Sequence, residues 1–534
     1  MKHISKHILF YHITFFLLGI AALSSCNKSL NQTPINATYS SAFWTNQVSV
    51  EQAMAAMYGQ FRAGIRTAPD YNMGEPSYFI FGDLVSGLFN VGSGDTFLGY
   101  AITPTNAKPY NFSYVPYEDG ALQDWSRFYQ VIALCNLALK NIPTMPDAVF
   151  LSPQAKNAYL GEALFMRSYT YFYMTRVWGD PVVVTKTYDD VDFGKIPPIA
   201  RTPQKQALDS CLRDLRTAAS YLNYSGGDPT KTVRANKGSV YALMAHIHEW
   251  LHNYDSAHYY CQQVINNGGY SLEPMNTYTN IWKGMISAES IFELPMLYSA
   301  NDPQFQNGNN WSEANFNTFA TFLKGNPVTY GTTIFKGSCW IADPDFITGN
   351  LYYSDTTMRN SDHRFNKIMQ FVPASGGDKA GYMLLKYTNF QLQNATQLSN
   401  PYINNDLVLM RLSDIYLLDA EALAYKGDIE GARNALAMTE NRAGITSYQD
   451  PDNTYDMVDE VVMERGRELI GEGQWFYDLI RTEYTNNWLE GVGYPANRVT
   501  AAQQGYYWPL DMGKLFPFDN LLVQIPYWAT NYGQ

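Results

Sequence analysis

The sequence predicts a mainly α-helical fold in which helical hairpins form a curved scaffold that carries long irregular segments. Three observations predict this fold. Apolar residues recur at helical spacing in several stretches, the predicted helices are joined in pairs by very short connections, and two long stretches between the pairs lack helical period. A chain of 534 residues, 46% of them hydrophobic, can bury a sizeable core in one large domain or in two to three ordinary ones.

Individual helices are marked by apolar stripes and by their start and stop signals. Thr202 and Pro203 suit the N-cap and the first position of a helix. A second helix stops at Gly179-Asp180-Pro181, and a third ends at Gly427. The stripes are Leu208, Cys211, Leu212, Leu215, Ala219 and Leu222 in the first helix, Leu160, Ala163, Leu164, Tyr171 and Met174 in the second, and Val408, Leu412, Ile415 and Ala422 in the third.

The predicted helices come in pairs of about the size of a tetratricopeptide repeat. Residues 235–252 and 255–267 are separated by "NYD", and residues 406–426 and 428–441 by "KGD". Such short connections force antiparallel neighbours. One hairpin cannot bury its own apolar stripe, so the hairpins are expected to stack on one another. The Trp/Gly/Tyr consensus of the tetratricopeptide repeat is absent, so this prediction depends on periodicity alone.

Two regions, residues 68–120 and 275–404, are rich in Asn, Gly, Ser, Thr, Tyr and Pro and show no helical period. Long irregular segments of a compact protein are usually functional loops held on a rigid frame. We therefore expect the binding residues of this protein in these two regions.

The N-terminus has the layout of an export signal. Lys2 and Lys6 precede an apolar run at residues 8–23, which is shorter than a membrane-spanning helix requires and is followed by small residues. The stretch Leu23-Ser24-Ser25-Cys26 matches the bacterial lipobox, so residues 1–25 are predicted to be removed and Cys26 to be lipidated. Several acyl chains give stable anchoring. The alternative is an ordinary secreted protein in which Cys26 is incidental.

Composition excludes some classes of partner and suggests others. The formal net charge is −12 and no long basic cluster exists, which argues against nucleic-acid binding, because that requires Lys and Arg to displace counterions from phosphates. Aromatic residues make up 15% of the chain, with 41 Tyr and 11 Trp, and suggest contact with carbohydrate or peptide. The cysteines after Cys26 are Cys135, Cys211, Cys261 and Cys339, and we interpret them as buried free thiols, although pairing remains open.

One motif suggests a metalloprotease. Residues 248–252 are HEWLH, an HExxH pattern, and His258 and Met275 follow at positions that suit a metzincin's third ligand and Met-turn. Two His at i and i+4 on a helix can share a zinc ion, with the Glu as general base. However, position 255 holds Asp where that pattern requires Gly, and Asp is a good N-cap. We therefore expect His258 on a second helix and a structural role for the motif.

A cluster of charged residues follows a helical spacing near the C-terminus: Glu464, Arg465, Arg467, Glu468 and Glu472. Charges that alternate in sign at this spacing are most often a solvated ion-pair face, and we predict that here. No GxSxG motif, P-loop or GxGxxG in a strand-to-helix setting occurs. We therefore predict no catalytic residue, no metal site and no cofactor.

Ligand-binding candidates come from aromatic residues with amide neighbours. Sugar rings lie flat on aromatic rings, while their hydroxyls need polar partners at the edges. The stretch 297–316, LYSANDPQFQNGNNWSEANF, supplies such a set without any helical stripe. The candidates are Trp311, Tyr298, Asn309 and Asn310, with Trp340 and Tyr100 as second choices.

Five segments together resemble the SusD/RagB family of nutrient-binding outer-membrane lipoproteins of Bacteroidetes. They are GEALFMRSYTYFYMTRVWGDPVVV, RANKGSVYALMAHIHEWLHNYDSAHYYCQQVINNGGYSLEP, ESIFELP, LVLMRLSDIYLLDAEALAYKGD and ERGRELIGEGQWFYDLIR, in the family's order. The resemblance implies about four tetratricopeptide-like hairpins in a right-handed superhelix. Residues 26–277 and 405–534 would form one composite helical domain, and residues 278–404 a loop-rich ligand-binding region. Trp282 resembles a buried position of the family.

The same resemblance implies a function. The protein would be anchored by lipid to the cell outer membrane, facing the exterior, and would capture oligosaccharide for a SusC-like TonB-dependent transporter. Alternatives are binding of peptides instead of glycans, a zinc-dependent hydrolase that uses residues 248–252, and a purely structural helical adaptor.

Overall fold

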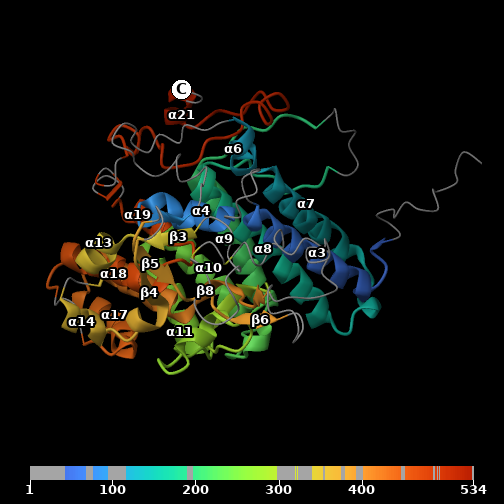
Figure 1. Cartoon of the computed structure of the whole chain (residues 1–534). Helices are drawn as coiled ribbons and strands as arrows, with labels where there is room; N and C mark the ends of the chain where they lie inside the picture. The colour runs from blue at the N-terminus through green and yellow to red at the C-terminus, as the bar shows by residue number, and fades with distance from the viewer. Residues whose placement is uncertain are drawn as a thin grey trace, which may run out of the picture.

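Helices dominate the structure, a computed structural model shown in Figure 1. This structure describes residues 43–67, 76–93, 116–188, 196–296, 319, 322, 339–352, 355–374, 379–392, 401–446, 451–484, 488–489, 491 and 494–531. The mainly helical class predicted from the sequence is confirmed. The proposed signal segment and Cys26 lie outside the described residues.

Four helical pairs form the scaffold. They are α3 (Gln47–Arg66) with α7 (Ser126–Asn141), α8 (Pro153–Trp178) with α9 (Gln204–Tyr221), α10 (Lys237–Trp250) with α11 (Tyr254–Asn267), and α16 (Leu412–Tyr425) with α17 (Ile429–Ala443). Each pair contacts the next, because α7 packs on α8, α9 on α10 and α11 on α16. The helix α18 (Thr454–Leu469) continues the stack on α16 and α17. The hairpins therefore stack as their apolar stripes require.

Helix α8 is the centre of the stack. Its N-cap Ser152 accepts a hydrogen bond from the backbone of Ala155, Pro153 takes the first helical position, and Gly179 ends the helix at a φ of +73°. An apolar stripe on one face was expected, yet every residue from 161 to 178 is buried. The reason is that α8 contacts α3, α7, α9 and α10, so neighbours cover it all round.

Three predicted helix starts differ from the structure. Residues 407–411, expected to begin a helix, form the strand β8 (Leu407–Arg411), which pairs antiparallel with β2 (Ser290–Leu294). A continuous apolar run of this length fits a buried strand and a buried helix equally well, so periodicity could not separate them. Helix α9 begins at Gln204 with Pro203 as its cap, and the cap of α11 is Asn253, which places Asp255 in the first turn.

The regions expected to be irregular contain short strands. A four-stranded antiparallel sheet has the order β1-β3-β5-β4, and β6 pairs with β7. The strands are β1 (Phe89–Ser93), β3 (Cys339–Ala342), β4 (Met369–Val372), β5 (Gly381–Leu384), β6 (Phe390–Leu392) and β7 (Pro401–Ile403). The remaining short helices of the described residues are α4 (Ser77–Gly82), α6 (Pro116–Gln123), α13 (Pro344–Phe346) with a π-turn at Ile347–Leu351, α14 (Thr356–Ser361), α15 (Phe365–Ile368), α19 (Trp475–Arg481) and α21 (Pro526–Asn531). Short 3-10 helices span Leu84–Ser86, Ile142–Thr144, Asp147–Val149, Pro229–Lys231 and Tyr278–Trp282.

The C-terminal segment 494–531 returns to the N-terminal half of the molecule, where Figure 1 shows it in red beside α6. Lys514 forms an ion pair with Asp124, and the backbone N–H of Trp508 donates to the carbonyl of Val177 at 2.8 Å. These contacts join the C-terminal segment to the N-terminal half of the chain, so residues far apart in sequence belong to one folded unit.

The cysteines described in full are Cys135, Cys211 and Cys261, all buried and unpaired, as predicted. Burial raises the pKa of the Cys135 thiol to about 12, which makes it unreactive at neutral pH. Among the described residues, no helix has the length and apolar character needed to cross a bilayer.

Asp83, just after α4, is a buried carboxyl at the contact between α4 and the turn before α19. One carboxylate oxygen accepts a hydrogen bond from the backbone N–H of Gly473 at 2.6 Å, and the other has no partner. Burial raises the pKa of Asp83 to about 7, although the bond from Gly473 acts in the opposite direction. Asp83 is therefore a proton-binding group of the folded state near neutral pH.

A pH-dependent contribution to stability follows from this carboxyl. Because the pKa is raised by folding, Asp83 binds more protons in the folded than in the unfolded chain between about pH 4 and pH 7, and its contribution to stability is lost as pH rises through that window. Between pH 5.5 and pH 8 the loss is about 2 kcal/mol for a pKa near 7. Urea unfolding of wild type and Asp83→Asn at both pH values should show it as a difference between the two proteins. Parallel pH dependence in the two proteins would contradict the assignment.

Candidate functional site

Residues 94–115 and 323–338, which belong to the two regions expected to carry ligand-binding residues, adjoin the β1–β3 pair of the four-stranded sheet. Strand β1 ends at Ser93, immediately before residues 94–115, and β3 begins at Cys339, immediately after residues 323–338. Because β1 and β3 are antiparallel, Ser93 and Cys339 are register partners. Ser93 and Cys339 therefore lie side by side, although they are 246 positions apart in the sequence.

Further anchors hold the longer region. Near its start, the backbone N–H of Met296 donates to the Asp406 carboxylate at 2.8 Å. Within it, Phe319 and Phe322 are fully buried, and Phe319 stacks on Tyr387 with ring centroids 4.6 Å apart. Phe322 packs against Phe79 of α4 at 4.9 Å and against Phe89 of β1 at 5.1 Å. The scaffold therefore fixes Phe319, which follows Trp311 by eight residues in the sequence.

The sequence-predicted ligand residues fall into two groups. Trp311, Tyr298, Tyr100, Asn309 and Asn310 lie outside the described residues, so they stay predictions. Trp340 lies in β3 and is only 1% exposed, so its ring is not available to a sugar in this structure. The expectation for Trp340 was wrong because a polar sequence neighbourhood does not reveal that a short strand buries the ring.

The HExxH motif does not have the geometry that a zinc site needs. Helix α10 ends at Trp250, so His252 lies beyond it with a φ of +54°, and its Nε2 lies 3.0 Å from the carbonyl oxygen of Arg481. His258 lies on α11, as predicted, and its Nδ1 is 2.6 Å from the Asp419 carboxylate. Across the ranges that the structure describes, no group of three or more His, Cys, Asp and Glu side chains could hold a metal ion. These contacts support a structural role for the motif.

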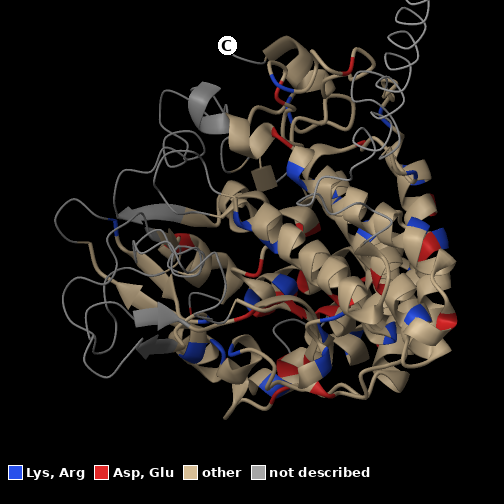
Figure 2. Ribbon diagram, turned by 90° about the vertical axis from the view of Figure 1, so that its right-hand side faces the viewer, with Lys and Arg blue, Asp and Glu red and all other residues tan. Residues whose placement is uncertain are grey.

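The charged cluster around α18 is buried, so the prediction of a solvated ion-pair face was wrong. Glu464, Arg465, Arg467, Glu468 and Glu472 are all at most 3% exposed. The sequence pattern misled because the opposite charges come from distant segments, which the spacing on α18 cannot show. Figure 2 shows basic and acidic residues interspersed along the ribbon of the whole molecule.

We call the buried ion pairs around Glu468 the core ion network. Its cations are Arg364, Lys386, Arg411, Arg442 and Arg467, and its anions are Glu289, Asp362, Glu460, Glu464, Glu468 and Glu472. Arg364 reaches Glu464 at 2.6 Å and Glu468 at 2.9 Å, while Arg411 reaches Glu289 at 2.7 Å. The network therefore ties the loop-rich region and β8 to α18.

The protonation states of the network follow from its packing. Burial alone raises the pKa of Glu468, but Arg442, Arg411 and Arg364 outweigh it and hold this pKa well below its ordinary value. Burial lowers the pKa of the Lys386 ammonium to about 8, against the attraction of Glu472. Every oxygen of Glu468 is occupied by arginine, which fits a structural network and leaves no free base for catalysis.

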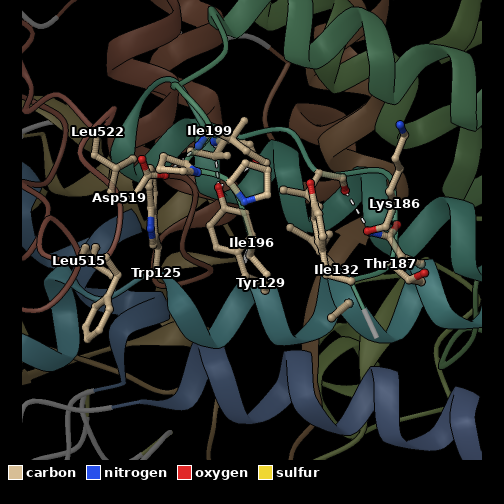
Figure 3. Close-up of a pocket in the computed structure, with 18 of the residues that line it drawn as sticks. Trp125, Tyr129, Ile132, Lys186, Thr187, Ile196, Ile199, Leu515, Asp519 and Leu522 are labelled. Atoms are coloured by element: carbon tan, nitrogen blue, oxygen red, sulfur yellow. Dashed lines mark hydrogen bonds between the residues drawn. The ribbon is translucent and has the colours of Figure 1, made fainter. Parts of the chain in front are cut away.

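A separate open trough lies along α7, and Figure 3 shows its lining. It encloses about 790 Å³. Trp125, Tyr129 and Ile132 rise from the α7 side, Ile196 and Ile199 lie opposite, and the C-terminal segment closes one end. Sequence reasoning missed it because its walls come from three parts of the chain that have no recognisable motif: residues 125–137, residues 182–188 with 196–199, and residues 515–522.

The fold defines a class of protein: a stack of helical hairpins that carries a small antiparallel sheet built from segments far apart in the sequence. Residues 252–531 match the family model described as "SusD family". Residues 102–248 match a second model, described as "Starch-binding associating with outer membrane". The chain belongs to the SusD family, as its sequence segments indicated.

Known relatives resemble the chain over most of its length. A SusD-like protein of Formosa agariphila is 25% identical over 542 residues, which cover 96% of this chain and 98% of that protein. The crystal structure of a SusD homologue from Bacteroides thetaiotaomicron has a TM-score of 0.70 at 23% identity and covers 91% of this chain and 99% of that one. A structure described as a laminarin-binding SusD-like protein has a TM-score of 0.67 at 21% identity, with 90% and 99% covered. These structures share the fold.

Proposed function

We propose that this protein is a lipid-anchored oligosaccharide-binding protein of the outer membrane that delivers its ligand to a SusC-like TonB-dependent transporter. The observation that carries the proposal is membership of the SusD family across residues 252–531. One relative in fold is described as laminarin-binding, and the second family model is described as starch-binding. The proposal is binding without catalysis, and of the motif at 248–252, His252 lies beyond the end of α10 with its ring against the carbonyl of Arg481.

The membrane anchor would be Cys26. From there to the first described residue, Phe43, the chain has 17 residues, which span at most roughly 60 Å when fully extended. Such a tether would let the folded part of the protein contact a transporter in the same membrane from the exterior side. Co-purification of the protein with a TonB-dependent transporter from membranes tests this partnership, and its recovery without any transporter would argue against it.

The ligand would bind where the two ring-rich regions leave the β1–β3 edge. This proposal is supported by the pairing of Ser93 with Cys339 and by the stacking of Phe319, eight residues after Trp311 in the sequence, on Tyr387. Trp311, Tyr298 and Tyr100 supply rings and Asn309 and Asn310 supply amides, the chemistry that sugars need. Trp340 is not part of this proposal, because β3 buries it.

Replacing Trp311 by alanine tests the proposed site. After a screen of oligosaccharides, including laminarin fragments, and of peptides, calorimetry on Trp311→Ala should show about tenfold weaker binding of the best ligand, or roughly 1.4 kcal/mol. The melting temperature should stay the same, because the ring would be replaced on the binding surface and not in the core.

A matched control is Tyr259→Ala, which removes an exposed ring from the scaffold helix α11. This variant should leave affinity unchanged. Unchanged affinity in Trp311→Ala would reject the site. Binding of peptides in place of sugars would reject the ligand class.

A further inference from the structure

The trough along α7 has the size and surface of a ligand site but not of a sugar site. Its 790 Å³ lies within the range of roughly 300–1,000 Å³ that ligand pockets occupy. Its lining is dominated by aliphatic, proline and aromatic side chains: Trp125, Ile132, Leu137, Val182, Val184, Ile196, Pro197, Pro198, Ile199, Leu515, Pro517, Phe518 and Leu522. A ligand in this trough therefore meets mainly carbon.

Three polar side chains that line the trough, Tyr129, Asn136 and Asp519, are already engaged by the protein. The Tyr129 hydroxyl donates to the carbonyl of Val182 at 2.9 Å and accepts from its N–H at 2.8 Å. The Asn136 amide donates to the carbonyls of Val184 and Lys186 and accepts from Arg167. Asp519 accepts from the backbone N–H of Ile199. A sugar would lose hydrogen bonds to water here without gaining these groups as partners.

The shape of the trough indicates a long, narrow ligand. Its floor follows α7 from Trp125 to Leu137, twelve residues, which is roughly 18 Å at 1.5 Å per residue. In Figure 3, Lys186 and Thr187 lie at one end of this floor and Leu515, Asp519 and Leu522 at the other. Among the described lining residues, the charged side chains Lys186 and Asp519 are confined to these ends, so the middle is uncharged.

We propose that this trough binds the aliphatic chain of a free fatty acid or a similar single-chain lipid. The chain would lie on the face of α7 formed by Tyr129, Ile132 and Ala133, with its polar head at an open end in water. Recognition comes from buried methylene groups, so affinity depends on chain length and only weakly on the head group. This site is independent of the proposed glycan site and would remain if that proposal failed.

Chain length gives the first test. Displacement of a fluorescent fatty acid from the purified protein should strengthen from octanoate through laurate to palmitate, by up to roughly fourfold per fully buried methylene. Lauryl alcohol should bind within about threefold of laurate, because the chain and not the charge is recognised. Absence of displacement, or affinity that does not vary with chain length, would overturn the proposal.

A substitution in the floor gives the second test. Ala133 is exposed on α7 and lines the trough, so Ala133→Trp should place a ring in the space of the ligand and weaken laurate binding by at least about tenfold. Ala56→Trp, on the exposed face of α3, is the matched control and should bind laurate like the wild type. Circular dichroism melting should show both variants folded. Equal laurate affinity in Ala133→Trp and Ala56→Trp would also overturn the proposal.

Discussion

Glu468→Gln should destabilise the protein by roughly 3–5 kcal/mol, as expected when one partner of a buried ion network is removed. In the wild type the Glu468 carboxylate contacts Arg364, Arg411 and Arg442, and the Tyr278 hydroxyl donates to it at 3.2 Å. A neutral amide of the same shape leaves three buried guanidinium groups short of one negative charge. Equilibrium unfolding in urea, with the m-value checked for a change in mechanism, measures the loss.

The control for this substitution is an ion pair in water. Lys205 and Asp209 on α9 lie 2.9 Å apart but are exposed, so Lys205→Ala should change stability by less than about 1 kcal/mol. The folded state also holds the pKa of Glu468 far below its ordinary value, so this carboxylate contributes stability above the pKa of the unfolded chain, and that contribution is lost as pH falls. The acid limb of the unfolding curve should therefore flatten in Glu468→Gln. A loss below 1 kcal/mol with an unchanged acid limb would show that the network is not stabilising in this way.

Trp282→Ala should cost roughly 3–5 kcal/mol, the usual range for deleting a buried indole. Trp282 is fully buried, as its resemblance to a family position indicated, and packs edge-on against Tyr278 at 5.3 Å. The Lys386 ammonium lies 4.8 Å from the ring centre, a cation–π contact in a desolvated setting. The substitution therefore opens a cavity and also removes the cation–π contact of the buried Lys386 ammonium.

Two further variants separate these contributions. Trp282→Phe keeps a ring beneath Lys386 and should cost less than Trp282→Ala, because the cavity is smaller. Tyr259→Ala removes an exposed ring from α11 and should leave the melting temperature almost unchanged. Differential scanning calorimetry compares the three proteins. A Trp282→Ala protein as stable as Tyr259→Ala would mean that the region around Trp282 can collapse onto the missing ring.

Much of the scaffold could be predicted from the sequence, because helices and their connections leave local signals. The Gly179-Asp180-Pro181 signal predicted the end of α8, and the three-residue connection "NYD" predicted the α10–α11 pair. The strands could not be predicted equally well. β8 has both faces buried, so its apolar run carries no alternation, and the four-stranded sheet joins segments more than 200 residues apart.

The candidate sites were harder to predict for a physical reason. Burial depends on what packs over a residue, and the residues around Trp340 or Glu468 in the sequence do not contain that information. The polar surroundings of Trp340 suggested a surface ring, and the alternating charges near Glu468 suggested a surface helix, yet both are covered by distant segments. The trough along α7 could not be predicted for the same reason, since three separate parts of the chain build it.

The pairing of Ser93 with Cys339 has an evolutionary consequence. Both irregular stretches begin and end on a fixed frame, and lengthening a tethered loop costs little, only about 0.6 kcal/mol for each doubling of its length. Insertions and exchanges in these stretches can therefore accumulate while the helices and their charged interior stay the same. Under the proposed function, sequence change in these two stretches would alter the ligand that is bound while the helical scaffold stays the same.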